Sequence, residues 1–230
     1  MTFKIPTSWR GRDGKKDYED VMSGKYDKKS ETKPFEKKPD TNDFVYVPSI
    51  NLYVAKEKIH LNKNWKDCWT ELKNQNYQML KINEFREFLK YTKENHKDIY
   101  DEITEVRNPW RAEWLDANFK VENKGLLKKG ELYILTENES KKEKLEDCLM
   151  EDKTPGIDLN DWINGKNISS QGLPNKNISS GSLYYWHPRS DNNSVAGFGA
   201  GGSRADLGCS GNPSDADSSL GVRPCKVLSA

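Results

Sequence analysis

The 39 residues from His187 to Cys225 contain no Lys, Met, Glu, Gln or Trp. These five amino acids fill 60 of the first 186 positions, so a segment of this length would hold roughly 12 or 13 of them at that frequency. A long Gly- and Ser-rich surface loop is also poor in such residues. A loop explains the scarcity, but it explains less easily the complete absence of five chemically unrelated types.

The five missing amino acids share one property, which is that no codon ending in a pyrimidine encodes them. An Asn codon randomised at its two adenines yields Asn, Asp, Ser, Gly, Ala, His, Arg and Cys among its products, and never the missing five. The segment is rich in these products, as in Gly201-Gly202-Ser203 and Ser210-Gly211-Asn212. The composition therefore indicates codons that have been diversified at adenines.

Apolar residues recur through the same segment, at Val195, Phe198, Leu207, Leu220 and Val222. Their spacing predicts short strands whose inward side chains belong to a core. The small polar residues between them then face outward or lie in loops, where substitution is tolerated better than in a core. We expect the ligand-binding, variable positions to be His187, Arg189, Asp191, Asn192, Gly199, Gly201, Gly202, Ser203, Asp206, Gly208, Ser210, Gly211, Asn212, Ser214, Asp215, Ala216 and Asp217.

Upstream of this segment, apolar patterns predict strands and helices. Runs of β-type residues at 44–47 and 52–54 predict a hairpin, and 132–135 predicts another strand. Stripes at helical spacing predict one helix after Asn64, with Trp65, Cys68, Trp69 and Leu72 on its buried face, and one after Asn83, with Phe85, Phe88 and Leu89. A third stripe comprises Ile99, Ile103 and Val106, and residues 139–150 predict a fourth helix with Leu145, Cys148 and Leu149 inward.

A charged segment surrounds two tryptophans, Trp110 and Trp114. Its ionisable residues are Arg107, Arg111, Glu113 and Asp116. They fit either an acid–base cluster or a structural set of salt bridges around buried indoles, and the structural interpretation is favoured.

Charge and hydropathy limit which partners and which cellular locations the sequence supports. The chain has 37 basic and 36 acidic residues, so nothing indicates electrostatic capture of nucleic acid. No apolar stretch approaches the roughly 18 residues of a transmembrane helix, and the N-terminus lacks the apolar run of a secretory signal. We therefore expect synthesis in the cytoplasm, and the sequence does not indicate where the protein is finally located. Residues 1–40 are charged and poor in apolar anchors, which predicts a flexible arm before a domain over 41–230.

The chain resembles the variable proteins of diversity-generating retroelements, especially those of archaea and candidate-phylum bacteria. The resemblance is specific in the last 50 residues and in the Trp-rich segment. The match begins near residue 43, and the residues that carry it are 105–116, 153–157, 170–174, 183–186, 193–196, Phe198, Ala200, Ala205, Leu207, Cys209 and 219–223. Gly197 departs from the pattern, because a larger and often basic residue is expected there.

The resemblance implies an α+β C-type lectin fold, of the kind shared with formylglycine-generating enzymes, with short mixed strands, two or three helices and a long irregular variable region over about 184–226. In such proteins a reverse transcriptase copies a template repeat with errors at adenines, and the copy replaces the 3′ part of the gene. The implied function is binding of a protein or cell-surface ligand, without catalysis, metal or cofactor. Oligomeric state is undetermined, with a monomer slightly favoured.

Three alternatives remain open from the sequence. An enzyme of the formylglycine-generating type would need a cysteine pair for copper, and only Cys209 and Cys225 lie near each other in sequence. The same spacing leaves a disulfide between them open. A calcium-dependent lectin would carry Glu-Pro-Asn or Gln-Pro-Asp, whereas here Asn212-Pro213 precedes Ser214. The third alternative is a structural or particle-surface module.

Overall fold

The computed structural model describes residues 40–122, 131–145 and 151–227. Apart from Asp40, the predicted N-terminal arm lies outside these residues. The helices are α2 (Trp65–Asn74), α3 (Ile82–Asn95), α4 (Lys97–Thr104) and α5 (Leu159–Ile163). The strands are β1 (Phe44–Val47), β2 (Leu52–Ala55), β3 (Gln78–Met79), β4 (Arg111–Glu122), β5 (Glu131–Thr136), β6 (Lys141–Lys144), β7 (Lys153–Ile157), β8 (Leu183–Trp186), β9 (Ser194–Ala200), β10 (Ala205–Gly211), β11 (Leu220–Val222) and β12 (Pro224–Lys226).

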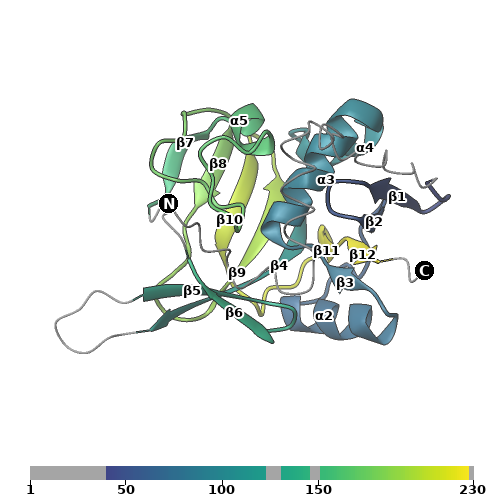
Figure 1. The fold of residues 1–230 in the computed structure, drawn as a ribbon, viewed down its shortest axis with the longest axis horizontal. Helices are drawn as coiled ribbons and strands as arrows, with labels where there is room; N and C mark the ends of the chain where they lie inside the picture. Colours follow the sequence, from purple (N-terminus) through teal and green to yellow (C-terminus); the bar gives the residue numbers. More distant parts are fainter. Residues whose placement is uncertain (1–39, 123–130, 146–150, 228–230) are drawn as a thin grey trace, which may run out of the picture. The chain divides into compact units, whose positions relative to one another are not determined.

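The strands form two sheets, so the predicted α+β class is confirmed. The larger sheet has the order β6-β5-β4-β9-β10-β8-β7, and β11 pairs with β4 outside this path. The smaller sheet has the order β1-β2-β12-β3. Figure 1 shows β8, β10, β9 and β4 as neighbouring strands at the centre of the larger sheet. No helix in the described part of the chain is long and apolar enough to cross a membrane.

The C-terminal segment contains four strands, β9 to β12, joined by loops, which corrects the expectation of a long irregular region. β9 and β10 are seven residues each and pair antiparallel, and β10 also pairs with β8 in parallel. The physical reason is the alternation along these strands, because every second side chain can enter the core. Val195, Phe198 and Leu207 are fully buried, Val222 is too, and Leu220 is 6% exposed, as the apolar spacing predicts.

Two helices pack against the inward face of the larger sheet. The Phe198 ring lies 5.1 Å from the Phe85 ring of α3 and 6.1 Å from the Trp162 ring of α5, centroid to centroid. A second core cluster joins Trp65 and Leu72 of α2 to Val195 and Val222. Helices that precede residue 187 in the sequence thus pack against the strands formed by the segment 187–225, which lacks Lys, Met, Glu, Gln and Trp.

The helix predicted over 139–150 is wrong where the structure describes it. Glu137, Asn138 and Glu139 have φ values of 54°, 54° and 65°, a backbone conformation that ends a strand in a turn. The chain then returns as β6, and Lys144 pairs with Glu131 of β5 at 2.7 Å. These charged residues therefore belong to an edge strand of the larger sheet rather than to a helix face. Leu145 is buried as expected, while Cys148 and Leu149 lie outside the described residues.

Helix boundaries follow the predictions with two exceptions. Asn64 caps α2, because its side chain accepts a hydrogen bond from the Asp67 amide at 2.9 Å. Asn83 is not the cap of α3, since that helix begins at Ile82 and Lys81 occupies the cap position. Val106 lies beyond the end of α4 and is exposed, whereas Ile99 and Ile103 are buried.

Candidate ligand-binding surface

The outward face of β9 and β10 is made of small residues. Burial alternates along both strands: Phe198, Ala200, Leu207 and Cys209 point into the core, and the residues between them are partly exposed. Those outward residues are Gly197, Gly199, Asp206, Gly208 and Ser210. Three of the five lack a side chain, so the sheet surface is bare at its centre.

Strand register places aromatic residues on both sides of this bare surface. Residues directly opposite one another in neighbouring strands point to the same face. One row across β8, β10, β9 and β4 consists of Trp186, Gly208, Gly197 and Trp114. The row beside it consists of Tyr184, Asp206, Gly199 and Ala112. Two indoles therefore flank a pair of glycines.

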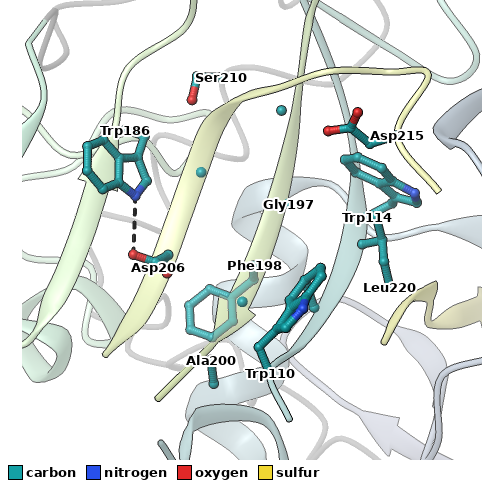
Figure 2. Close-up of a pocket in the computed structure, with 15 residues that line it drawn as sticks. Trp110, Trp114, Trp186, Gly197, Phe198, Ala200, Asp206, Ser210, Asp215 and Leu220 are labelled. Atoms are coloured by element: carbon teal, nitrogen blue, oxygen red, sulfur yellow. Dashed lines mark hydrogen bonds between the residues drawn. The ribbon is translucent and has the colours of Figure 1, made fainter. Parts of the chain in front are cut away.

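A pocket of about 380 Å³ opens over these rows. Figure 2 shows Trp186 and Asp206 on one side of Gly197, and Trp114 and Asp215 on the other. The residues that line the pocket are Trp110, Ala112, Trp114, Trp186, Gly197, Phe198, Gly199, Ala200, Gly201, Asp206, Gly208, Ser210, Gly211, Asp215 and Leu220.

The β8 side of the pocket holds an ordered polar cluster. The Trp186 indole donates to the Asp206 carboxylate at 3.2 Å, and Arg204 Nε donates to the same oxygen at 3.0 Å. The Arg204 guanidinium lies 4.7 Å from the centroid of the Tyr184 ring and 5.7 Å from that of Trp186. Two rings and one carboxylate thus hold a cation that comes from the β9–β10 turn.

On the β4 side of the pocket, one tryptophan is buried and the other is exposed. Trp114 is 4% exposed and donates to the Lys63 carbonyl at 3.3 Å, so its ring is part of the fold. Trp110 is 42% exposed. Asp215 is exposed in the loop between β10 and β11.

Seven of the seventeen predicted binding positions line the pocket. They are Gly199, Gly201, Asp206, Gly208, Ser210, Gly211 and Asp215. The other ten lie in three connections: His187, Arg189, Asp191 and Asn192 between β8 and β9, Gly202 and Ser203 between β9 and β10, and Asn212, Ser214, Ala216 and Asp217 between β10 and β11.

Several of these loop side chains hold the turns in which they lie. Asp217 accepts from the Ser219 amide at 2.7 Å, Asn212 from the Ser214 amide at 3.1 Å, and Asp191 from the Asn193 amide at 3.0 Å. Asn192 has a φ of 60° and accepts from the Val121 amide. Their first role is local structure of the Asx-turn kind, and a ligand would meet them as part of that turn.

The glycines of the predicted set differ in the room around them. A Cβ at Gly208 would lie no closer than 3.8 Å to another atom, and one at Gly202 would meet nothing within 4 Å. At Gly211 it would lie 3.0 Å from the Val195 carbonyl oxygen and 3.1 Å from the Trp114 ring. Gly208 and Gly202 therefore accept side chains readily, whereas Gly211 requires its neighbours to move.

Sequence reasoning missed the contribution of β4 to the pocket. Trp110, Ala112 and Trp114 line it, although they precede the depleted segment by more than 70 positions. Their proximity follows from the pairing of β4 with β9, which local patterns do not reveal. Trp186 entered the sequence argument only within the range 183–186, which carries the family resemblance, and not as a binding residue. Gly197, singled out as a departure from the family pattern, does line the pocket.

A buried ion cluster lies on the other face of β4. Glu113 is fully buried and accepts from Arg111 at 2.7 Å and from Arg223 at 2.9 Å. Burial opposes ionisation of this carboxyl, but the two guanidinium groups outweigh it and lower the Glu113 pKa to about 2. Glu102 pairs with both arginines from α4. The structural interpretation of this charged segment is the one that fits, with Arg223 as an additional member.

Asp116 does not belong to that cluster. It accepts hydrogen bonds from the Trp69 indole at 3.1 Å and from the Glu137 amide at 2.7 Å. Burial raises the Asp116 pKa to about 7, because these two donors compensate the lost hydration only in part. One strand thus carries two buried carboxyl groups with opposite shifts in pKa.

The cysteines lie inside the fold. Cys209 and Cys225 are both buried, and Cys225 is not bridged, so the Cys209–Cys225 disulfide left open by the spacing is not formed. Burial raises the pKa of the Cys225 thiol well above its usual value. Within the described ranges, no three His, Cys, Asp or Glu side chains are grouped so as to hold a metal ion.

Searches against known protein families, curated proteins and solved structures find no match to this chain.

Proposed function

We propose that this chain is a diversified ligand-binding protein, in which residues between 187 and 217 are rewritten by adenine-directed mutagenesis and presented on a C-type lectin scaffold. The fold family and the retroelement origin rest on the sequence resemblance. The α+β architecture and the C-terminal strands at the centre of a sheet are consistent with both.

One observation carries the proposal. In β9 and β10, the part of the segment that forms the sheet, residues divide by strand alternation into a buried set and an outward set, and the outward set lines one pocket. A diversified binding protein needs this separation, because changes at outward positions leave the core contacts intact. An ordinary Gly- and Ser-rich loop has no reason to place its residues in this way.

Sequencing of the locus across its source population tests the proposal. We expect substitutions at codons of outward positions such as Asp206, Gly208 and Ser210, each reachable from an Asn codon by changes at adenines. Phe198 and Leu207 should be constant. A reverse transcriptase gene and a template repeat should lie nearby. Identical segments in all copies, or substitutions spread equally over inward and outward codons, would overturn the proposal.

A further inference from the structure

The pocket has an uneven charge composition. Two carboxylates and three indoles line it, those of Asp206, Asp215, Trp110, Trp114 and Trp186, and no Lys or Arg is among the described residues that line it. Indole faces attract cations through the ring quadrupole, and carboxylates attract them directly. Both charged residues that line the pocket are acidic, so the lining chemistry favours a cation over an anion.

The molecule already holds one cation in this way. Arg204 forms an ion pair with Asp206 at 3.0 Å and lies over the rings of Tyr184 and Trp186. Its guanidinium shows which group this combination of carboxylate and aromatic face accommodates. Arginine suits such a site better than lysine, because the planar group stacks on a ring while its N–H groups reach a carboxylate.

The opposite side of the pocket carries the same two kinds of group without an internal cation. Asp215 lies beside Trp114 in Figure 2, and the exposed Trp110 lies farther along β4, beside Ala200. Among the described residues, Asp215 forms no ion pair, in contrast to Asp206. An incoming cation therefore has an available carboxylate on this side.

The floor between the two sides leaves room for a chain. Trp186 and Trp114 lie on strands separated by β10 and β9, which corresponds to about 14 Å between the two strand axes. Gly208 and Gly197 occupy the floor between them and project no side chain. A width of this order accommodates an extended peptide segment as well as one side chain.

We infer that the pocket binds an arginine side chain presented by an extended segment of a protein partner, with Asp215 as its carboxylate partner, the accessible part of Trp114 beside it and the exposed Trp110 ring farther along β4. This inference rests on the proposed function, since it takes the same face as the binding surface. It adds the chemical class of the ligand for this particular copy of the chain.

Calorimetric titration of the full chain with three peptides tests the inference. The probes are acetyl-Gly-Arg-Gly-Arg-Gly-amide and the two versions in which Gln or Glu replaces Arg. We expect binding of the Arg peptide, weakened by added salt, and at least about tenfold weaker binding of the Gln and Glu peptides. Equal affinity for all three peptides, or absence of binding by the Arg peptide, would overturn the inference.

Paired variants locate the binding. Asp215→Asn should weaken binding of the Arg peptide about tenfold, whereas Asp98→Asn, at an exposed carboxylate of α4 outside the pocket, should not. Gly208→Leu fills the floor and should abolish binding, while Thr70→Leu, at an exposed position of α2 outside the pocket, should leave it unchanged. Equal effects within either pair would contradict the assignment of the pocket.

Failure here is distinguishable from failure of the proposed function. Binding of the Gln or Glu peptide that Gly208→Leu abolishes would overturn the arginine specificity and leave the face as a binding surface. A locus without adenine-linked variation would refute diversification, and the peptide titration would still decide whether this pocket takes a cation.

Discussion

The two faces of β9 and β10 are built under opposite constraints. Inward, Phe198 and Leu207 are fully buried, and Phe198 lies against the rings of Phe85 and Trp162. Outward, Gly208 has room for a side chain, and Asp206 faces the pocket. Substitutions at neighbouring positions of the same strand should therefore differ widely in their effect on the free energy of unfolding. Strand alternation is sufficient to separate residues that hold the fold from residues that can change.

β4 refines this contrast. Its outward residues Ala112 and Trp114 line the pocket, and Glu113 between them belongs to the buried ion cluster. Under the proposed function, the pocket has a constant side from β4 and a changeable centre from β9 and β10. A binding surface of this kind retains fixed aromatic anchors while the residues between them vary.

The largest expected effect is at the inward face. Phe198→Ala should lower the free energy of unfolding by about 3–5 kcal/mol, because a cavity replaces the ring between α3 and α5. Urea denaturation measures the change, and Phe198→Leu provides a milder variant if the first does not fold. Gly199→Ala, the outward neighbour, should change stability by less than about 0.5 kcal/mol. Similar losses for Phe198→Ala and Gly199→Ala would remove the contrast between the faces.

A comparable loss is expected at the ion cluster. Glu113→Gln leaves Arg111 and Arg223 buried without their shared carboxylate, which should cost about 3–5 kcal/mol in urea denaturation. Glu143→Gln removes an exposed carboxylate of β6 and should cost less than about 1 kcal/mol. If both variants are equally stable, the cluster is not required to hold β4.

A pH-dependent effect is expected from Asp116. Its pKa is about 7 in the folded chain and near 3.8 when unfolded, so the folded state retains a proton that the unfolded state loses. The stabilising contribution is complete below about pH 4 and is lost as pH rises to about 7, at up to about 1.4 kcal/mol per pH unit. Asp116→Asn should remove this slope in urea denaturation series.

Glu113 provides the opposite sign on the same strand. Its folded pKa of about 2 lies below the ordinary value of 4.5, so its contribution is complete above pH 4.5 and is lost as pH falls toward 2. Between pH 5 and 7 the Asp116 slope is opposed by His60, because burial lowers the pKa of that imidazole, so the part of the slope that Asp116→Asn removes is the Asp116 contribution. A wild-type slope in this range that Asp116→Asn leaves unchanged would contradict the assignment.

The smallest effect is expected at the centre of the outward face. Gly208→Leu should shift the free energy of unfolding by less than about 0.5 kcal/mol, because its Cβ enters open space. Thermal unfolding of this variant and of Gly202→Leu should be nearly superimposable. Destabilisation of Gly208→Leu alone would show that the pocket floor takes part in the fold.

Local patterns in the sequence predicted the parts of the fold that depend on local chemistry. The helix capped by Asn64, the hairpin of β1 and β2, and the buried set around Phe198 and Leu207 were all predicted correctly. Their signals are periodicity and capping, which act over a few residues.

The errors and omissions have a common physical origin. Residues 141–144 form a strand because β5 is available to pair with them, and the positive φ values at 137–139 reverse the chain. The contribution of Trp110 and Trp114 to the pocket arises from pairing across about 85 residues of sequence. Arg223 joins Glu113 over a separation of 110 residues. Such contacts depend on the register between distant strands, which no short pattern contains.

The most direct test is a pair of matched libraries. In one, Gly199, Asp206, Gly208, Ser210 and Asp215 receive the residues that an adenine-randomised Asn codon encodes, and in the other the same residues replace inward positions of β9 and β10, namely Ala196, Phe198, Ala205, Leu207 and Cys209. Protease resistance of the displayed variants measures the folded fraction. We predict that most members of the outward library fold and that few of the inward library do. Equal folded fractions in the two libraries would contradict the separation of a rewritable face from a fixed core.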